Sequence, residues 1–355
     1  MSLQNQSLIF AKIPTGLPTS EHLRLISSEI PSNAPAGGLL LQTLYLSLDP
    51  YMRGCMRDPK IKTYSDAYIV GKTFSNYGIS RVIESNDMRF TRGDIVVPRI
   101  AKTEFSLYQV VSAAEVPLFT IVSAENGIPL TYYIGVLGMP GVTAYHSLMN
   151  VAGPVKSGET ILISAAAGAV GQIVGQLAKL NGLRVVGSVG SDEKVKFVTE
   201  ELGFDAAWNY KKEPDYYAAI DKYIPEGIDI YYDNVGGPIL DAAFAKTKVY
   251  GRIISCGAIS QYNLLPEERY GYKNLVEIFQ RRLTVKGFIT RDLFVNHPES
   301  VKEIKNEMAK LVEKDGGASF LFKEDITEGI ENTITAFQGL LTGKNNGKVI
   351  MKFSS

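Results

Sequence analysis

Residues 160–180, TILISAAAGAVGQIVGQLAKL, decide the fold of this chain. The stretch begins with a short apolar run at 160–164, which has the length of a buried strand. A turn of alanine and glycine follows at 165–171. Beyond the turn, apolar residues recur at the spacing of one helical face: Ile173, Val174, Leu177 and Leu180. A strand, a turn of small residues and a helix in this order predict the first unit of a doubly wound α/β sheet.

The turn itself predicts a phosphate-binding site. Read against the pattern Gly-x-Gly-x-x-Gly, it places Ala166, Gly168 and Gly171 at the three glycine positions. Gly168 lets a pyrophosphate approach the backbone, Gly171 lets the helix pack close to the strand, and the helix N-terminus attracts phosphates. The predicted dinucleotide contacts are Gly168, Ala169, Val170 and Gly171. The alternative is a tightly packed turn that binds nothing, because alanine replaces the first glycine.

The alternation of strands and helices continues downstream of the turn. A helix is expected at 192–202, beginning at Ser191 or Asp192, and strands are expected at 185–189, 206–209, 228–232 and 252–256. Continuous apolar strands that alternate with helices indicate a parallel sheet covered on both faces. This segment is therefore predicted to be a doubly wound α/β domain.

Both ends of the chain differ from this segment. The first third is β-rich, with short apolar runs between turns at 39–46, 79–83 and 95–97. The end of the chain holds a helix at 301–312 that stops at Gly316-Gly317, a second helix at 330–341 and a strand at 349–353. The apolar stripe of the first helix is Val301, Ile304, Met308 and Leu311. Because the last helix and the last strand cannot form a core by themselves, we expect this tail to pack onto the β-rich first third.

The second strand of the α/β segment helps to choose the nucleotide. An NAD enzyme usually places a carboxylate at the end of this strand, where it binds the ribose hydroxyls. Here the strand ends at Val189, and Asp192 comes late and fits a helix N-cap better. Lys194 and the phenol of Tyr210 can instead meet a 2′-phosphate. NADPH is therefore favoured over NADH, with a solvated helix lysine as the alternative for Lys194.

Composition and charge exclude several classes of protein. Lys+Arg and Asp+Glu are balanced at 37 each, which argues against nucleic acid as a partner. The two cysteines and three histidines are too few for a disulfide framework or a cysteine-based zinc site, so no metal is expected. The chain has no secretory leader pattern and no apolar run of about 20 residues. We expect a cytoplasmic protein without a membrane segment.

Seven stretches, in the right order, give the chain a family resemblance. They are residues 46–53 (LSLDPYMR), 137–145 (LGMPGVTAY), 165–171 (AAAGAVG), 187–194 (GSVGSDEK), 233–237 (DNVGG), 256–263 (CGAISQYN) and 343–348 (GKNNGK). With them the chain resembles the medium-chain dehydrogenase/reductase superfamily. Within it, the chain is similar to the zinc-independent branch of prostaglandin reductases, leukotriene hydroxydehydrogenases and alkenal double-bond reductases.

The resemblance implies a fold and an assembly. A GroES-like, β-rich catalytic domain is expected over residues 1–133, completed by residues 317–355. A Rossmann domain that binds NADPH is expected over residues 134–316. The resemblance also suggests a homodimer.

The resemblance further implies roles for single residues. Lys194 and Tyr210 match contacts to the 2′-phosphate, although Glu200-Glu201 adds one residue before 202–205 and loosens the match at Tyr210. The remaining cofactor contacts that it implies are Asn234, Cys256, Gly257, Ala258, Ile259, Ser260, Tyr262, Phe288, Ile289, Thr290 and Asn345. Tyr51, in the turn after residues 39–46, is expected to line the substrate site. A turn aromatic that caps the β-rich domain is the equal alternative for Tyr51.

The activity implied is the NADPH-dependent reduction of the carbon–carbon double bond of α,β-unsaturated aldehydes and ketones. Tyr262 is the candidate catalytic residue, because its phenol can donate a hydrogen bond to the enolate oxygen. His146 is expected to be a structural residue of a helix, and Cys256 a small apolar residue at a strand end. Two alternatives stay open: a carbonyl or quinone reductase of the same fold, and a protein that binds or senses NADPH with little turnover.

Overall fold

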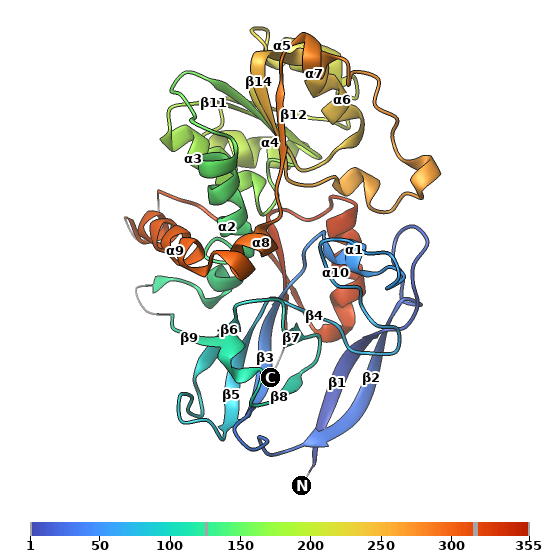
Figure 1. Ribbon diagram of the computed structural model, residues 1–355, viewed down its shortest axis with the longest axis vertical. Helices are drawn as coiled ribbons and strands as arrows, with labels where there is room; N and C mark the ends of the chain where they lie inside the picture. The colour runs from blue at the N-terminus through green and yellow to red at the C-terminus, as the bar shows by residue number, and fades with distance from the viewer. Residues whose placement is uncertain (1, 125–126, 315–318, 354–355) are drawn as a thin grey trace. The chain divides into compact units, whose positions relative to one another are not determined.

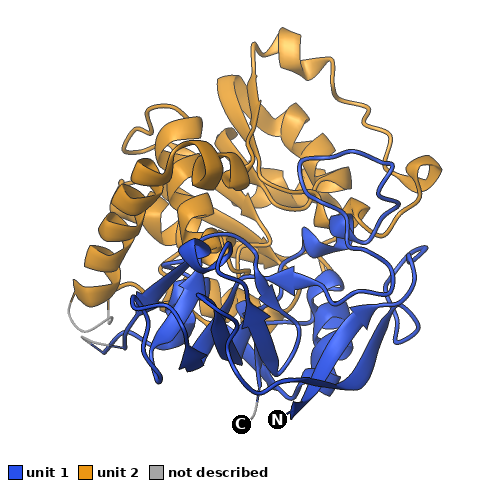
Figure 2. Cartoon of the chain, turned by 60° about the horizontal axis from the view of Figure 1, so that its bottom comes forward, with its two compact units in different colours: residues 1–138, 324–355 blue, residues 139–323 orange. Residues whose placement is uncertain are grey.

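The computed structural model describes residues 2–124, 127–314 and 319–353. The chain forms two compact units (Figure 2), residues 1–138 with 324–355, and residues 139–323. The domain limits drawn from the sequence, after 133 and after 316, stay predictions. The second of these limits, and the stop expected at Gly316-Gly317, lie outside the described residues.

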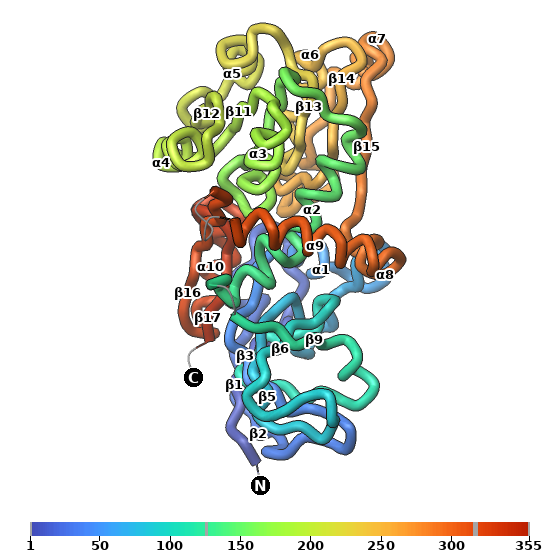
Figure 3. The backbone as a smooth tube through the Cα atoms, turned by 90° about the vertical axis from the view of Figure 1, so that its left-hand side faces the viewer, coloured from blue at the N-terminus to red at the C-terminus, as the bar shows by residue number. Residues whose placement is uncertain are grey.

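A six-stranded parallel sheet forms the centre of the second unit (Figure 3), with β12 at one edge and β15 at the other. Its strand order is β12-β11-β10-β13-β14-β15. The strands are β10 (Thr160–Ser164), β11 (Arg184–Val189), β12 (Ala206–Asn209), β13 (Ile228–Asp233), β14 (Thr247–Ser255) and β15 (Thr284–Gly287). With the strands numbered as they occur in this sheet, the order is 3-2-1-4-5-6. This is the Rossmann order, in which the strand order reverses beside the first strand.

Helices cover both faces of this sheet (Figure 1). The helices of this unit are α2 (Met139–His146), α3 (Gly171–Leu180), α4 (Asp192–Lys196), α5 (Tyr216–Tyr223), α6 (Gly237–Lys246), α7 (Glu277–Gln280), α8 (Thr290–Asn296) and α9 (Pro298–Glu313). Of these, α8 and α9 pack on α2. Leu162, Val186 and Tyr231 point from neighbouring strands into a core shared with α5 and α6. The helix predicted at 192–202 is α4 followed by a wider turn at Phe197–Glu201.

Helix α3 is held unusually close to the rest of its unit. Residues 171–178 are buried, and a Cβ on Gly175 would lie 2.0 Å from the ring of Phe204. Two glutamines on α3 pair with extended backbone: Gln176 exchanges hydrogen bonds of 2.8 Å with both the N–H and the C=O of Leu321. Gln172 bonds Lys323 in the same way, at 2.8 and 3.1 Å. These buried amides are therefore satisfied, as burial requires.

The first unit is β-rich. One sheet contains β3 (Leu39–Ser47), β5 (Gly78–Ser85), β6 (Ile95–Pro98), β8 (Tyr108–Val111), β9 (Phe119–Val122), β16 (Glu324–Glu328) and β17 (Lys348–Lys352). Two further pairs are β1 (Ser2–Phe10) with β2 (Leu23–Pro31), and β4 (Ser75–Asn76) with β7 (Thr103–Glu104). Its helices are the short α1 (Met52–Cys55) and α10 (Thr333–Leu341).

The tail of the chain joins this β-rich unit. Strand β17 pairs antiparallel with β3, with Ile350 opposite Ser47, and Ile350 is buried with Ile79 and Val97. The predicted fold class, a Rossmann sheet together with a GroES-like β-rich unit, is confirmed. No helix among the described residues is long and apolar enough to cross a membrane.

One strand was not predicted, and two local expectations were wrong. Strand β15 was not predicted, because its four residues are all exposed at the sheet edge and form no apolar run. On α9, Val312 rather than Leu311 is buried with the other members of the stripe. The N-cap of α4 is Ser191, whose Oγ accepts from the N–H of Lys194 at 3.3 Å, and not Asp192.

Candidate functional site

The glycine turn after β10 is built for close approach. Ala165 has a φ of +49°, which turns the chain sharply at the end of the strand. A Cβ on Gly171 would lie 2.5 Å from the Ala165 carbonyl oxygen, so no larger residue fits without a shift. Gly168, Ala169 and Val170 are half-buried and precede the N-terminus of α3. The N-terminus of a helix carries a partial positive charge and its N–H groups can hold a phosphate.

Gly190, the residue after β11, leaves room for a neighbouring side chain. A Cβ on Gly190 would lie 2.9 Å from the hydroxyl oxygen of Tyr210, so glycine is what allows this phenol to lie against the strand end. Lys194 lies one turn further, on α4, and is half-buried. The structure thus brings Tyr210 and α4 to the same strand end.

Asp192 is engaged by other residues. Its carboxylate accepts from Asn209 Nδ2 at 2.9 Å and forms an ion pair with Lys212. The hydrogen bond from Asn209 and the one from Lys212 lower the pKa of Asp192. The Asp192 side chain is still 57% exposed, so these contacts leave it lone pairs for a further donor.

The carboxyl ends of β13 and β14 meet through hydrogen bonds. Asn234 follows β13, and its Nδ2 donates to the carbonyl of Ser164 at the end of β10, at 2.8 Å. The N–H of Ile259 donates to the carbonyl of Asn234 at 3.2 Å. Ser260 is tied to Val235 by its N–H and by its hydroxyl, at 3.2 and 2.7 Å. The loop 256–260 and Asn234 are therefore held together.

A buried carboxylate, Asp233, supports this junction. Its Oδ1 accepts from the Tyr231 hydroxyl and from the N–H groups of Val235 and Gly236, at 2.9, 3.1 and 2.9 Å. Burial raises the pKa of Asp233, against the lowering effect of those N–H groups. The N–H groups of Cys256 and Gly257 both donate to the Asp233 carbonyl, at 2.9 and 3.0 Å. Asp233 was not singled out from the sequence, where an aspartate at a strand end carries no distinct signal.

Tyr262 closes the loop that begins at Cys256. Its hydroxyl oxygen accepts the N–H of Ala258 at 3.1 Å, so the phenolic proton is left to be donated elsewhere. Burial raises the pKa of Tyr262, and the Ala258 N–H opposes that shift. The phenol therefore keeps its proton at neutral pH.

The stretch 288–290 follows β15 at the far edge of the sheet. Phe288 and Ile289 are half-buried, and Thr290 is buried at the start of α8. The Thr290 hydroxyl lies 2.9 Å from that of Thr143 on α2. His146, at the end of α2, contacts the Phe288 ring edge-on, and burial lowers its pKa.

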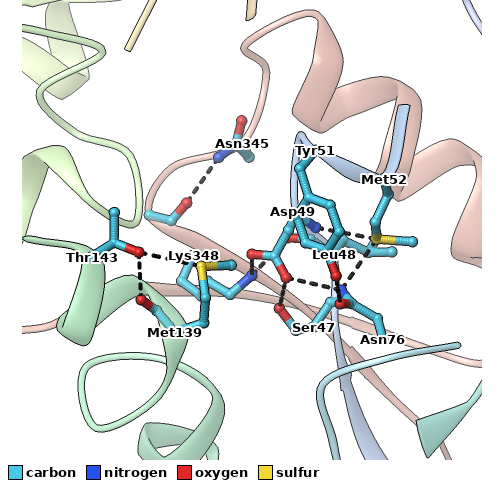
Figure 4. A network of polar contacts seen from close by, with 11 residues as sticks. Ser47, Leu48, Asp49, Tyr51, Met52, Asn76, Met139, Thr143, Asn345 and Lys348 are labelled. Carbon is cyan, nitrogen blue, oxygen red and sulfur yellow. Dashed lines mark hydrogen bonds and ion pairs between the residues drawn. The ribbon is translucent and has the colours of Figure 1, made fainter. Parts of the chain in front are cut away.

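Two predicted site residues belong to the first unit. The hydroxyl of Tyr51, the residue before α1, donates to Asn76 Oδ1 at 2.6 Å. Asn345 is half-buried, and its Nδ2 donates to the carbonyl of Gly347 at 2.8 Å. Beside Tyr51 lies a buried ion pair, Lys348 Nζ to Asp49 Oδ1 at 3.0 Å (Figure 4). The sequence motifs contained Asp49 and Lys348, but no role was read from them.

Metal ligands do not gather among the described residues. No group of three or more His, Cys, Asp and Glu side chains lies there in a way that could hold a metal ion. Neither cysteine forms a disulfide: Cys55 is buried and Cys256 is of intermediate exposure. In the second unit, polar groups gather at the carboxyl ends of the parallel strands, where open α/β sheets bind their ligands.

Comparison with known families matches both units. The family described as zinc-binding dehydrogenase matches residues 169–314. The family described as the N-terminal domain of oxidoreductase matches residues 6–116.

Relatives match the chain from end to end. The chain is 43% identical over 354 residues to an NADP-dependent oxidoreductase of Cochliobolus heterostrophus, covering 99% of this chain and 98% of that protein. It is 39% identical over 355 residues to an NADP(+)-dependent 2-alkenal reductase of Nicotiana tabacum, with 99% and 98% covered. CurA of Vibrio vulnificus, solved in complex with NADPH, is 35% identical with a TM-score of 0.87, and 99% of each chain is covered.

Proposed function

Because the chain belongs to the zinc-independent alkenal reductase family of medium-chain dehydrogenases/reductases, we propose that it reduces the carbon–carbon double bond of α,β-unsaturated aldehydes and ketones with NADPH. The family makes it an NADP-dependent oxidoreductase. The bond that is reduced is the proposed part. The observation that carries it is the hydrogen bonding of Tyr262, which has a proton to donate beside the cofactor loop.

NADPH is the cofactor, as the sequence predicted and as the relatives confirm. The described residues fit it in two places. Gly171 leaves no room for a side chain at the start of α3, and the glycine at 190 lets the Tyr210 phenol lie at the end of β11. We propose that residues 168–171 hold the pyrophosphate, and that Lys194 and Tyr210 hold the 2′-phosphate. Bound there, NADPH supplies a hydride.

The residues of the loop after β14 provide position and a hydrogen-bond donor. Asn234 and the segment 256–260 are cross-linked by backbone hydrogen bonds, so the loop is preorganised. We propose that the Tyr262 phenol donates to the carbonyl oxygen of the substrate, on which negative charge develops as the double bond is reduced. A preorganised donor of this kind typically lowers the barrier by about 2.7–4 kcal/mol. Phe288, Ile289, Thr290 and Asn345 are proposed as further contacts on the nicotinamide side.

The test is a turnover assay with purified protein, NADPH and a panel of enals, enones and quinones. We expect loss of reduced-nicotinamide absorbance with enals and enones, and formation of the saturated carbonyl compound. Tight NADPH binding with no turnover on any member would favour the sensing alternative. Turnover of quinones alone would favour the quinone reductase alternative.

A further inference from the structure

The carboxylate of Asp233 holds the turn that follows β13. The residue is 1% exposed, and its Oδ1 accepts the N–H groups of Val235 and Gly236 at 3.1 and 2.9 Å. The same oxygen accepts the hydroxyl of Tyr231 at 2.9 Å. Gly236 has a φ of +64°, which glycine adopts more readily than other residues. The shape of the turn at 235–236 therefore depends on one buried oxygen atom.

The turn in its place holds the loop that precedes Tyr262. The carbonyl groups of Asn234 and Val235 accept the N–H groups of Ile259 and Ser260, both at 3.2 Å. The Ser260 hydroxyl donates to the Val235 carbonyl as well, at 2.7 Å. Because these bonds join backbone to backbone, a shift of the turn also shifts the loop.

The phenol of Tyr262 is bound to the same loop. The N–H of Ala258 donates to the phenolic oxygen at 3.1 Å, so the position of Ala258 sets where that oxygen lies. A Cβ on Gly236 would lie 2.9 Å from the Cβ of Ala258, so the turn packs directly on this residue. A Cβ on Gly257 would lie 3.1 Å from the phenolic oxygen. The phenolic oxygen therefore follows any movement of the turn and the loop.

These contacts form one path from the Asp233 carboxylate to the Tyr262 hydroxyl. We propose that Asp233 is a positioning residue for the reaction: through the turn and the loop it holds the Tyr262 phenol where its proton can meet the substrate carbonyl oxygen. The inference rests on the proposed function, because Tyr262 must act as the donor. A reacting group that is misplaced by about 1 Å can cost about a hundredfold in rate, so a small shift of the turn is enough to be measured.

The second oxygen of Asp233 indicates that the path needs an acceptor and not a charge. Oδ2 has no hydrogen-bond partner among the described residues, although a buried carboxylate is costly unless its oxygens are paired. An amide can place its oxygen where Oδ1 lies and its nitrogen where Oδ2 lies. Asp233→Asn therefore keeps the acceptor for the two N–H groups of the turn, whereas Asp233→Ala removes it.

A double-mutant cycle separates positioning from a general loss of structure. The cycle compares kcat at saturating NADPH and trans-2-hexenal for the wild type, Asp233→Ala, Tyr262→Phe and the double variant. We expect Asp233→Ala to lower kcat by about tenfold, but by less than about twofold in the Tyr262→Phe background. Asp233→Asn should keep most of the wild-type kcat. Thermal unfolding and NADPH binding by fluorescence show whether each variant is folded.

Asp205→Ala is the matched control for this cycle. Asp205 also accepts a backbone N–H, that of Val185 at 2.7 Å, but it precedes β12 and so lies at the amino ends of the parallel strands. Any loss of kcat in Asp205→Ala should be the same with and without Tyr262→Phe, because this contact is not part of the path.

Hydrogen exchange of the free protein gives a readout that does not depend on turnover. In Asp233→Ala we expect faster exchange in the turn 234–237 and also in the loop 256–262, and in Asp233→Asn near wild-type exchange in both. If Asp233→Ala does not fold, Ser164→Ala takes its place in both experiments, with the same pattern expected at a smaller size. It removes the acceptor of the Asn234 N–H, which lies 2.9 Å from Ser164 Oγ.

Three outcomes in folded variants would overturn the proposal. They are an unchanged kcat in the variant that loosens the turn, a fall in kcat that is equally large in the Tyr262→Phe background, and unchanged exchange in the loop 256–262. A merely structural role for Asp233 would give the second of these outcomes. No turnover of trans-2-hexenal by the wild type would refute the proposed function and this inference with it, whereas turnover with any of the three outcomes overturns this inference alone.

Discussion

Single hydrogen bonds assign different roles to tyrosines of similar appearance. The chain has 19 tyrosines, and most phenols in proteins serve packing. Tyr262 accepts from a backbone N–H and can donate its proton. Tyr51 donates to a side-chain oxygen and can only accept. We therefore assign the donation to the substrate carbonyl to Tyr262 alone.

Replacing Tyr262 with phenylalanine tests this assignment. Tyr262→Phe should lower kcat by about a hundredfold, the usual effect of removing one oxyanion donor, with NADPH affinity changed less than about twofold. Steady-state kinetics and a fluorescence titration measure the two quantities. Tyr250→Phe is the matched control, because that side chain is 71% exposed. An unchanged kcat in Tyr262→Phe would mean that Tyr262 has a packing role and no catalytic one.

The pH profile gives a second reading of the same residue. The raised pKa of Tyr262 means that its donor form persists throughout the neutral and mildly alkaline range. We expect no fall in kcat from this group between about pH 7 and pH 10, the ordinary pKa of tyrosine. A decline centred well below pH 10 that disappears in Tyr262→Phe would contradict the structure.

Lys194 is the residue on which the choice of NADPH can be tested. Lys194→Ala should raise the KM for NADPH at least tenfold, about 1.4 kcal/mol, because a charged contact to the 2′-phosphate is lost. The KM for NADH, which lacks that phosphate, should stay within about twofold. Lys196→Ala, on the exposed face of the same helix, is the control. Equal changes for the two cofactors would remove Lys194 from the phosphate site.

Cys256 lies in the cofactor loop of a protein proposed to bind electrophilic enals. Burial raises the pKa of its thiol to about 12, and only the thiolate is nucleophilic. At pH 8 we expect Cys256 to remain unmodified by excess trans-2-hexenal in the folded protein and to react once the chain is unfolded in urea. Peptide mass spectrometry measures both states. Rapid adduct formation at Cys256 in the folded protein would show that the thiol is not protected.

At the scale of the element, α3 has two roles, each of which depends on one glycine: the phosphate turn on Gly171 and the packing of the helix on Gly175. A Cβ at 171 would meet the backbone of the phosphate turn, whereas a Cβ at 175 would meet the buried ring of Phe204. Gly171→Ala should therefore reduce the free energy of NADPH binding more than the free energy of unfolding. Gly175→Ala should reduce the free energy of unfolding by about 1–3 kcal/mol through overpacking, with NADPH affinity less affected.

Urea unfolding and NADPH titration of the two variants form one matched test. Each variant serves as the control for the other, because both add one methyl group to the same helix. The same effect on binding and on stability in both variants would mean that the turn and the helix body do not act separately.

Elements were predictable from the sequence where burial dictates a pattern. Strand β10 and helix α3 have the predicted bounds, because every residue of β10 is buried and α3 repeats its apolar positions each turn. Strand β15 has no such pattern, since hydrogen bonding to β14 and not burial keeps it in the sheet. The side of α9 that is buried could be read only to within one residue.

The candidate site was predictable only where a motif is continuous in the chain. Residues 168–171 and 256–262 are continuous segments, and the structure puts both at the carboxyl edge of one sheet. The contacts of Tyr51 are not continuous: they join residues 47, 49, 76 and 348 through β3, β4 and β17. Only folding brings these groups together, and a buried asparagine has no signature in the sequence.

At the scale of the whole molecule, the second unit has the Rossmann strand order, and the tail completes the β-rich unit. The homodimer that the resemblance suggests stays a prediction, as do the assigned roles of the site residues. What unites them is a single claim: this protein reduces the double bond, and not the carbonyl group, of an enal with NADPH.

The fate of the transferred hydrogen tests this claim most directly. The protein is incubated with trans-2-hexenal and NADPH deuterated at both positions of the nicotinamide C4, and the product is examined by NMR and mass spectrometry. The account predicts hexanal with one deuterium at C3, the β-carbon, and with the aldehyde intact. Deuterium at C1 of an unsaturated alcohol, or tight NADPH binding with no labelled product, would contradict it.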